Sequence, residues 1–249
     1  MTHELRDDIR AWWNDDAGHY DRSAGHALSD PVEAAAWAAA LERSLPAPPS
    51  RVLDAGAGTG SLSLLAAELG HDVTALDLSE GMLAAARRKA EKQGRPISFV
   101  VGPAEDPPPG PFDAVIERHV VWTLPDPVGA LRAWRTVAPA GRLVLFEGSW
   151  GGEGPSSLVA VKDRAAAAIR WIRRDADDHH AAYPERVLAR LPLAGTSSSA
   201  PFVEAVAAAG WRRVRIERLA DVEWAKSSRE PWPLGWLSAR PQYAIIADA

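Results

Sequence analysis

Segments typical of strands and of helices alternate along the chain from residue 51, and this alternation constrains the fold more than any other feature. Five short apolar runs, each followed by a segment with helical spacing or a turn, are found at residues 51–55, 71–79, 96–102, 112–116 and 142–148. Such alternation predicts a parallel sheet with helices on both faces. A helix, a glycine stop and a strand at 200–219, with a last strand at 241–249, complete the pattern.

The predicted fold is α/β: a Rossmann-like, seven-stranded, mostly parallel sheet with helices on both faces, in one domain. We divide the chain into an N-terminal helical cap, a cofactor-binding core, a lid insertion with two helices, and a C-terminal helix with strands. The four parts are residues 1–45, 46–148, 149–200 and 201–249. Both additions are expected to cover the carboxyl ends of the strands, where ligands bind in such sheets.

Composition narrows the class of partner. The formal net charge of −5 gives no electrostatic footprint for a phosphate backbone, so a nucleic-acid partner is not expected. The sequence has no cysteine, which excludes thiolate chemistry and cysteine metal sites. No apolar run is long enough for a signal peptide or a bilayer span, so we expect a cytoplasmic protein without a membrane partner. Monomer and homodimer both fit the sequence.

The loop after the first predicted strand, residues 54–60, reads "DAGAGTG". Its glycine spacing is shorter than the G-x-G-x-x-G of dinucleotide-binding folds, and Asp54 precedes it. A carboxylate there repels a pyrophosphate but attracts an α-amino group. S-adenosylmethionine carries such an amino group and a sulfonium, so charge favours it over a nicotinamide dinucleotide.

Asp77 ends the second predicted strand. An acid at this point can accept hydrogen bonds from both hydroxyls of a ribose. The alternative role is a helix cap, because a helix follows. The glycine loop with its leading acid, together with an acid after the second strand, indicates a nucleoside-binding site.

With these motifs, the chain resembles the class I S-adenosylmethionine-dependent methyltransferases. The resemblance covers roughly residues 45–150 and is carried by "VLDAGAGTG", "ALDLSEGML", "GPAED", "FDAVIERHVVWTLPDP" and "LRAWRTVAPAGRLVLFEG". It is greatest to the small-molecule branch, in which N-terminal helices and a mid-chain insertion form a lid. It implies that the last strands form an antiparallel hairpin.

The resemblance also implies a cofactor site on the glycine loop and at the ends of the next strands. Its residues would be Tyr20, Asp54, Ala55, Gly56, Gly58, Gly60, Asp77, Leu78, Met82, Ala104, Glu105 and Arg118. Leu78 and Met82 would pack near the adenine, and Glu105 would meet its edge. Arg118 would offer its backbone carbonyl to the amino group of the cofactor. Tyr20 would close over the methionine carboxylate.

Methyl transfer from a sulfonium is an in-line displacement, which needs a base only if the nucleophile still carries its proton. His119 follows the fourth strand and is either this base or a structural histidine that bonds a backbone carbonyl. Glu147 faces the pocket or forms a salt bridge. His180 lies in the acidic stretch "DADDHHAAY", which is a pocket segment or a solvated helix end. The expected substrate pocket is formed by Trp12, His26, His119, Trp122 and Tyr183.

No metal site is predicted, because adjacent histidines point in different directions on a helix and no i, i+4 histidine pair exists. Two residues depart from the family pattern: Pro103, where an acid is common, and Glu117, where a small residue is common. Glu117 either serves the local structure of this chain or contacts the substrate.

The sequence "ERHV" stands where nucleobase methyltransferases have Asn-Pro-Pro-aromatic. We therefore expect methyl transfer to oxygen or nitrogen, with carbon as a third option, of a small organic molecule. The alternatives are a related protein that uses the cofactor for other chemistry and a non-catalytic nucleoside-binding protein.

Overall fold

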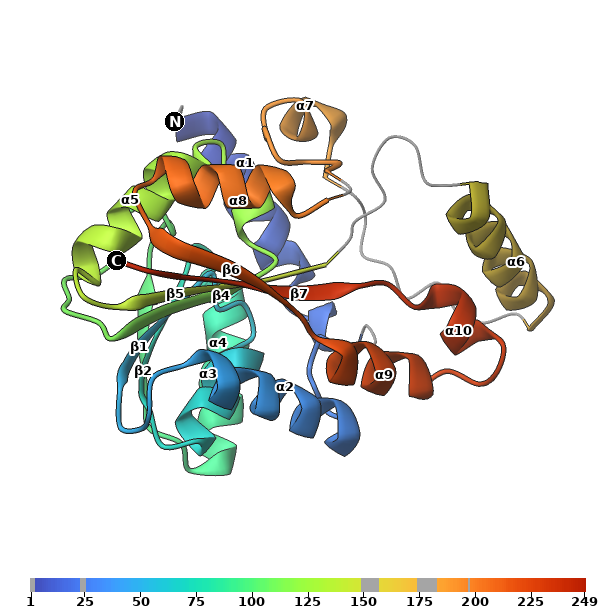
Figure 1. Cartoon of the computed structure of the whole chain (residues 1–249), viewed down its shortest axis with the longest axis horizontal. Helices are drawn as coiled ribbons and strands as arrows, with labels where there is room; N and C mark the ends of the chain where they lie inside the picture. The colour runs from blue at the N-terminus through green and yellow to red at the C-terminus, as the bar shows by residue number, and fades with distance from the viewer. Residues whose placement is uncertain (1–2, 23–25, 149–156, 174–182, 197) are drawn as a thin grey trace.

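The computed structural model describes residues 3–22, 26–148, 157–173, 183–196 and 198–249. In this part of the chain, seven strands form one twisted sheet between layers of helices (Figure 1). The strands are β1 (Arg51–Ala55), β2 (Asp72–Asp77), β3 (Ile97–Val101), β4 (Ala114–Arg118), β5 (Arg142–Gly148), β6 (Arg212–Arg218) and β7 (Gln242–Asp248). The helices are α1 (His3–Asp16), α2 (Pro31–Ser44), α3 (Ser61–Glu68), α4 (Glu80–Gln93), α5 (Pro127–Val137), α6 (Ser157–Arg173), α7 (Glu185–Leu188), α8 (Ala200–Ala208), α9 (Ala220–Ser228) and α10 (Leu234–Ser238).

The strand order is β3-β2-β1-β4-β5-β7-β6, and β7 runs antiparallel to both of its neighbours. The predicted Rossmann-like fold is therefore confirmed, including the hairpin of β6 and β7. The chain moves outward from β1 to β2 and β3, and then returns to place β4 on the other side of β1. Ligands bind at such a switch in strand order, beyond the carboxyl ends of the strands.

The central strands β1, β4, β5 and β7 are buried on both faces, as the continuous apolar runs predicted, whereas the edge strands β3 and β6 are partly exposed. On β5, Leu143 and Leu145 belong to the apolar cluster under α5 and α8, whereas Val144 and Phe146 belong to the cluster under α2 and α9. This alternation follows from the two-residue period of a strand. The core therefore holds the strand ends rigidly where the site is built.

The N-terminal segment is predicted as one cap, but its helices α1 and α2 lie in two different places. Helix α2 is part of the core: Trp37 is fully buried, and its ring packs edge-on against Phe146 with centroids 5.4 Å apart. Helix α1 instead lies across the carboxyl ends of the strands (Figure 1). Asp30 caps α2, since its side chain accepts hydrogen bonds from the N–H groups of Val32 and Glu33.

The two described helices of the predicted lid insertion also lie in different places. Helix α6 packs against α10, beyond the end of the sheet, while the short α7 packs beside α1 (Figure 1). Helices α9 and α10, between β6 and β7, were not predicted. None of the described helices is both long and apolar enough to cross a membrane.

Candidate active site

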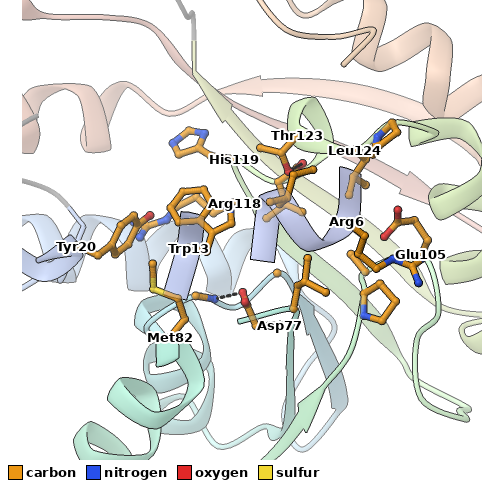
Figure 2. Close-up of a pocket in the computed structure, with 18 residues that line it drawn as sticks. Arg6, Trp13, Tyr20, Asp77, Met82, Glu105, Arg118, His119, Thr123 and Leu124 are labelled. Atoms are coloured by element: carbon orange, nitrogen blue, oxygen red, sulfur yellow. Dashed lines mark hydrogen bonds between the residues drawn. The ribbon is translucent and has the colours of Figure 1, made fainter. Parts of the chain in front are cut away.

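A cavity lies at the carboxyl ends of β1, β2, β3 and β4, under α1 (Figure 2). Its walls come from the loops that follow these four strands, from one face of α1 and from Tyr20. The lining residues are Arg6, Ile9, Trp13, Tyr20, Gly56, Gly58, Asp77, Leu78, Met82, Pro103, Ala104, Glu105, Arg118, His119, Val120, Thr123, Leu124 and Pro125. Ten of the predicted site residues, nine of them cofactor residues, are therefore brought together in one place.

The glycine loop gives this cavity a floor of bare backbone. Gly56 has φ of +75°, and a Cβ there would lie 2.3 Å from a methyl carbon of Val120. Gly58 has φ of +55°, and a Cβ would meet no atom within 4 Å. Gly56 is thus required for packing below the loop, whereas Gly58 keeps open a space that a side chain would fill.

Asp77 lies at the cavity wall, where Figure 2 shows its carboxylate beside the glycine loop. Its two oxygens accept hydrogen bonds from the N–H groups of Gly58 and Ser79, each at 2.7 Å. Burial raises the pKa of Asp77 to about 6. The N-cap of α4 is Ser79, whose hydroxyl accepts from the Met82 N–H at 3.1 Å. The capping role considered for Asp77 therefore belongs to Ser79.

Asp54 is buried beside a smaller cavity that shares Tyr20, Gly56, Gly58 and Arg118 with the larger one. Burial raises its pKa to about 6, although a hydrogen bond from the Ser63 hydroxyl at 2.5 Å and the charge of Arg118 oppose this shift. The predicted carboxylate for an amino group thus lies directly next to the main cavity.

Two predicted cofactor residues do not reach either cavity. Ala55 ends β1 with its methyl group in the core, fully buried. Gly60 begins α3, and a Cβ there would meet the Cβ of Ala86 on α4 at 2.9 Å. Both residues lie behind the loop, and neither lines a cavity.

Helix α1 closes the cavity with residues that the sequence reasoning missed. Arg6, Ile9 and Trp13 lie on one face of α1, as their spacing of three and four allows, and all three line the cavity. The helix is tied down by Asn14, whose Oδ1 accepts from the Ser79 hydroxyl at 2.7 Å and the Gly81 N–H at 3.1 Å. The spacing of three and four residues between Arg6, Ile9 and Trp13 was the signal that could have identified these three cavity residues.

Three aromatic residues predicted for the substrate pocket form a layer behind the cavity instead. The Tyr183 ring lies 4.8 Å from Trp12 and 5.9 Å from Trp122, in an apolar cluster between α1 and α7. His26 stacks on the ring of Tyr20 at 4.1 Å. These residues support the walls, and it is Trp13 that faces the cavity.

Arg118, the last residue of β4, lines both cavities, and its side chain makes contacts of its own. Its guanidinium donates a hydrogen bond to the His26 carbonyl at 3.1 Å and lies over the ring of Trp37. The same carbonyl accepts from the Ser61 hydroxyl at 2.6 Å. A cation therefore stands between both cavities, held by the segment that precedes α2.

His119 lines the cavity at the end of β4, in a backbone conformation with φ of +64°. Its Nδ1 lies 3.3 Å from Oε2 of the buried Glu147, the penultimate residue of the neighbouring strand β5. Burial, Lys226 and Arg118 lower the pKa of His119 well below its usual value. This shift favours the uncharged form of the imidazole.

Glu117 explains how the turn at His119 is held. Its buried carboxylate accepts hydrogen bonds from the N–H groups of Val120 at 2.7 Å and Val121 at 3.3 Å. Burial raises the pKa of Glu117 to about 8. These hydrogen bonds favour a role for Glu117 in the local structure over a role as a substrate contact.

His180 lies outside the described residues, as does the adjacent His179. In the part of the chain that the structure describes, no three His, Asp or Glu side chains gather as metal ligands would.

Taken together, the bare glycine loop, the carboxylate after β2 and the buried carboxylate beside it form a site for a nucleoside that carries a charged amino-acid group. Residues 53–145 match the family described as "Methyltransferase domain". Over 243 residues, the chain is 31% identical to the ubiquinone biosynthesis O-methyltransferase of Xanthomonas axonopodis pv. citri (strain 306), covering 96% of this chain and 88% of that protein.

Solved structures of other methyltransferases share the fold. Geranyl diphosphate C-methyltransferase from Streptomyces coelicolor A3(2), with S-adenosyl-L-homocysteine bound, has a TM-score of 0.60 at 16% identity and covers 99% of this chain and 98% of that one. Phosphoethanolamine N-methyltransferase 2 of Haemonchus contortus, also with S-adenosylhomocysteine, has a TM-score of 0.63 at 17% identity, covering 98% and 59%.

The chain belongs to the class I S-adenosylmethionine-dependent methyltransferases. The residues present fit the cofactor: the space above Gly58 is open, and Asp77 and Asp54 each line one of the two cavities that share Gly56 and Gly58. S-adenosylmethionine is accordingly the methyl donor.

Proposed function

We propose that this methyltransferase acts on an oxygen of a small organic molecule and that His119 is the general base. The observation that supports the base is the position of His119 on the cavity wall, with its Nδ1 3.3 Å from the buried Glu147 carboxylate. Oxygen is chosen over nitrogen and carbon because the relative that is similar over nearly the whole chain is an O-methyltransferase.

In this proposal, the cofactor is held by the residues at the strand ends. Asp77 accepts hydrogen bonds from the ribose hydroxyls, and Asp54 binds the α-amino group. Leu78, Met82 and Ala104 form the apolar side of the cavity and contact the adenine. When bound, the cofactor supplies an electrophilic methyl group on a sulfonium.

The protein contributes alignment and proton removal. Helix α1 covers the cavity and excludes water, since its residues Ile9 and Trp13 close one side. His119 takes the proton of the acceptor hydroxyl as the oxygen attacks. The carboxylate of Glu147 orients the ring and stabilises the imidazolium that forms, as a carboxylate partner does for a catalytic histidine.

The test combines product mass with a base variant. Purified protein is screened with labelled S-adenosylmethionine against phenols, catechols, amines and enolisable carbonyl compounds, and we expect a phenolic or alcoholic product that gains one CH₂. His119→Asn keeps the left-handed backbone conformation, which Asn tolerates, but removes the base. We expect kcat to fall by about 100-fold.

S-adenosylhomocysteine affinity, measured by calorimetry, should stay near the wild-type value in His119→Asn. A large loss of affinity would assign His119 to the cofactor site instead. A product that gains no CH₂ would contradict methyl transfer itself, and methylated amines or carbons alone would contradict the choice of oxygen.

A further inference from the structure

The short helix η1 (Tyr20–Arg22) contributes a wall that is common to the two cavities. Its first residue, Tyr20, lines the large cavity and also the smaller one that Asp54 lines. Figure 2 shows Tyr20 at the opposite end of the large cavity from Glu105. Helix η1 therefore stands beside the place where the amino-acid group of the cofactor is proposed to lie.

Asp21, the next residue, joins η1 to two other elements through its two carboxylate oxygens. Its Oδ1 accepts a hydrogen bond from the hydroxyl of Thr59, in the glycine loop, at 2.6 Å. Its Oδ2 lies 2.9 Å from Nζ of Lys89, a residue of α4. We call the side chains of Asp21, Thr59 and Lys89 the latch. The latch ties η1 to the loop after β1 and to the helix after β2.

Thr59 connects the latch to the cofactor site. This residue is almost fully buried and lines the smaller cavity together with Asp54. The neighbouring loop residue is itself held, because the Gly58 N–H donates a hydrogen bond to Asp77 at 2.7 Å. A buried hydroxyl that loses its partner is unfavourable. The contact with Thr59 therefore favours one position of η1 relative to the glycine loop.

Lys89 holds the other oxygen of Asp21 by charge. Burial lowers the pKa of Lys89, and its contact with Asp21 opposes this shift. An ion pair that is partly removed from water holds a carboxylate more firmly than a neutral hydrogen bond does. Neither Asp21 nor Lys89 lines the two cavities, so both act on the site through the position of η1.

The latch is separate from the contacts that hold α1. Helix α1 is tied by Asn14 to Ser79 and Gly81, at the start of α4. The latch instead ties η1 to the glycine loop and to the later turns of α4. Because the two sets share no residue, the wall formed by Tyr20 and the cover formed by α1 can be changed independently.

We propose that the latch positions Tyr20 against the amino-acid group of the cofactor, so that the enzyme discriminates between S-adenosyl amino acids and nucleosides that lack this group. This inference rests on the proposed placement of the amino-acid group beside Asp54. Asp21, Thr59 and Lys89 are then positioning residues, and the contact with the ligand is made by Tyr20.

The test compares two ligands that share the thioadenosine part. S-adenosylhomocysteine carries the amino-acid group, whereas 5′-methylthioadenosine does not, and calorimetry gives the Kd of each. Thr59→Val keeps the shape of the side chain but removes the hydroxyl. We expect it to weaken S-adenosylhomocysteine binding by about tenfold, as the loss of one well-placed hydrogen bond would, and to leave 5′-methylthioadenosine binding unchanged. Thr59→Ser restores the hydroxyl and should restore the wild-type preference.

Lys89→Met removes the other contact of Asp21 at a site outside both cavities and should give the same selective loss. Thr136→Val is the matched control, because the exposed Thr136 hydroxyl bonds only within α5, and it should change neither affinity. Asn14→Ala should weaken both ligands alike, since α1 covers the part that they share. A Thr59→Val or Lys89→Met protein that binds both ligands as wild type does, or that loses both equally, would overturn the proposal.

Asp54→Asn separates the latch from the placement on which it rests. If this variant lowers the preference for S-adenosylhomocysteine while Thr59→Val and Lys89→Met do not, the latch alone is wrong. If Asp54→Asn leaves the preference unchanged, the amino-acid group does not lie beside Asp54, and the proposed placement fails together with the latch.

Discussion

At the scale of single residues, burial sets the chemistry of the cofactor site. The pKa of Asp54 is raised to about 6, so its carboxylate gains a proton and loses its charge as pH falls through 6. The α-ammonium group of the bound cofactor then loses the negative charge of Asp54 that is proposed to hold it. We expect the affinity for S-adenosylhomocysteine, measured by calorimetry, to fall about tenfold between pH 7.5 and pH 5, since a proton must be removed before binding.

Asp54→Asn tests this prediction at the same residue. The amide carries no charge at any pH, so the variant should bind weakly at pH 7.5 and lose less affinity on acidification. Asp77 has a similarly raised pKa and accounts for the pH dependence that remains. A wild-type affinity that does not change with pH would show that neither carboxylate is protonated in this range.

At the scale of elements, α1 is held over the cavity by a few polar contacts with the first turn of α4. Asn14 supplies two of them, to Ser79 and Gly81. Each such hydrogen bond contributes about 1 kcal/mol. Asn14→Ala should therefore loosen α1 and raise the dissociation rate of S-adenosylhomocysteine by about tenfold.

Stopped-flow displacement measures this dissociation rate. Asp15→Ala changes an exposed neighbour on the same helix and should leave the rate unaltered. If both variants dissociated at the wild-type rate, α1 would not act as a cover for the cofactor.

At the scale of the whole molecule, the N-terminal segment combines a cover and a piece of the core. Deleting residues 1–19 should weaken cofactor binding but leave the sheet folded, as judged by far-UV circular dichroism. Trp37→Ala should do the opposite. It should reduce the free energy of unfolding by about 3–5 kcal/mol in urea titrations, because Trp37 is fully buried on α2.

The folded fraction of Trp37→Ala should still bind S-adenosylhomocysteine, although Arg118 loses the ring beneath its guanidinium. If the deletion unfolded the sheet, or if Trp37→Ala abolished binding in folded protein, the division between α1 and α2 would be incorrect.

The sequence predicted those parts of the fold and site that depend on neighbouring residues. Strand alternation, the glycine loop and the acids at the strand ends are local patterns, so Asp54, Asp77 and His119 could be found without coordinates. Which face of α1 turns toward the sheet depends on packing between residues that are distant in the chain. The sequence therefore indicated an aromatic wall but chose Trp12, and the structure shows Trp13 on the cavity.

What the sequence determined by itself was the Rossmann-like sheet and the charge of its ligand, because periodicity and turn chemistry act between residues close in the chain. Only the tertiary structure decided which distant groups meet. Glu147 reaches His119 because β4 and β5 are neighbours, and Gln242 lies opposite Gly148 because β7 runs antiparallel to β5. These contacts depend on how the elements pack, and packing is a property of the whole chain.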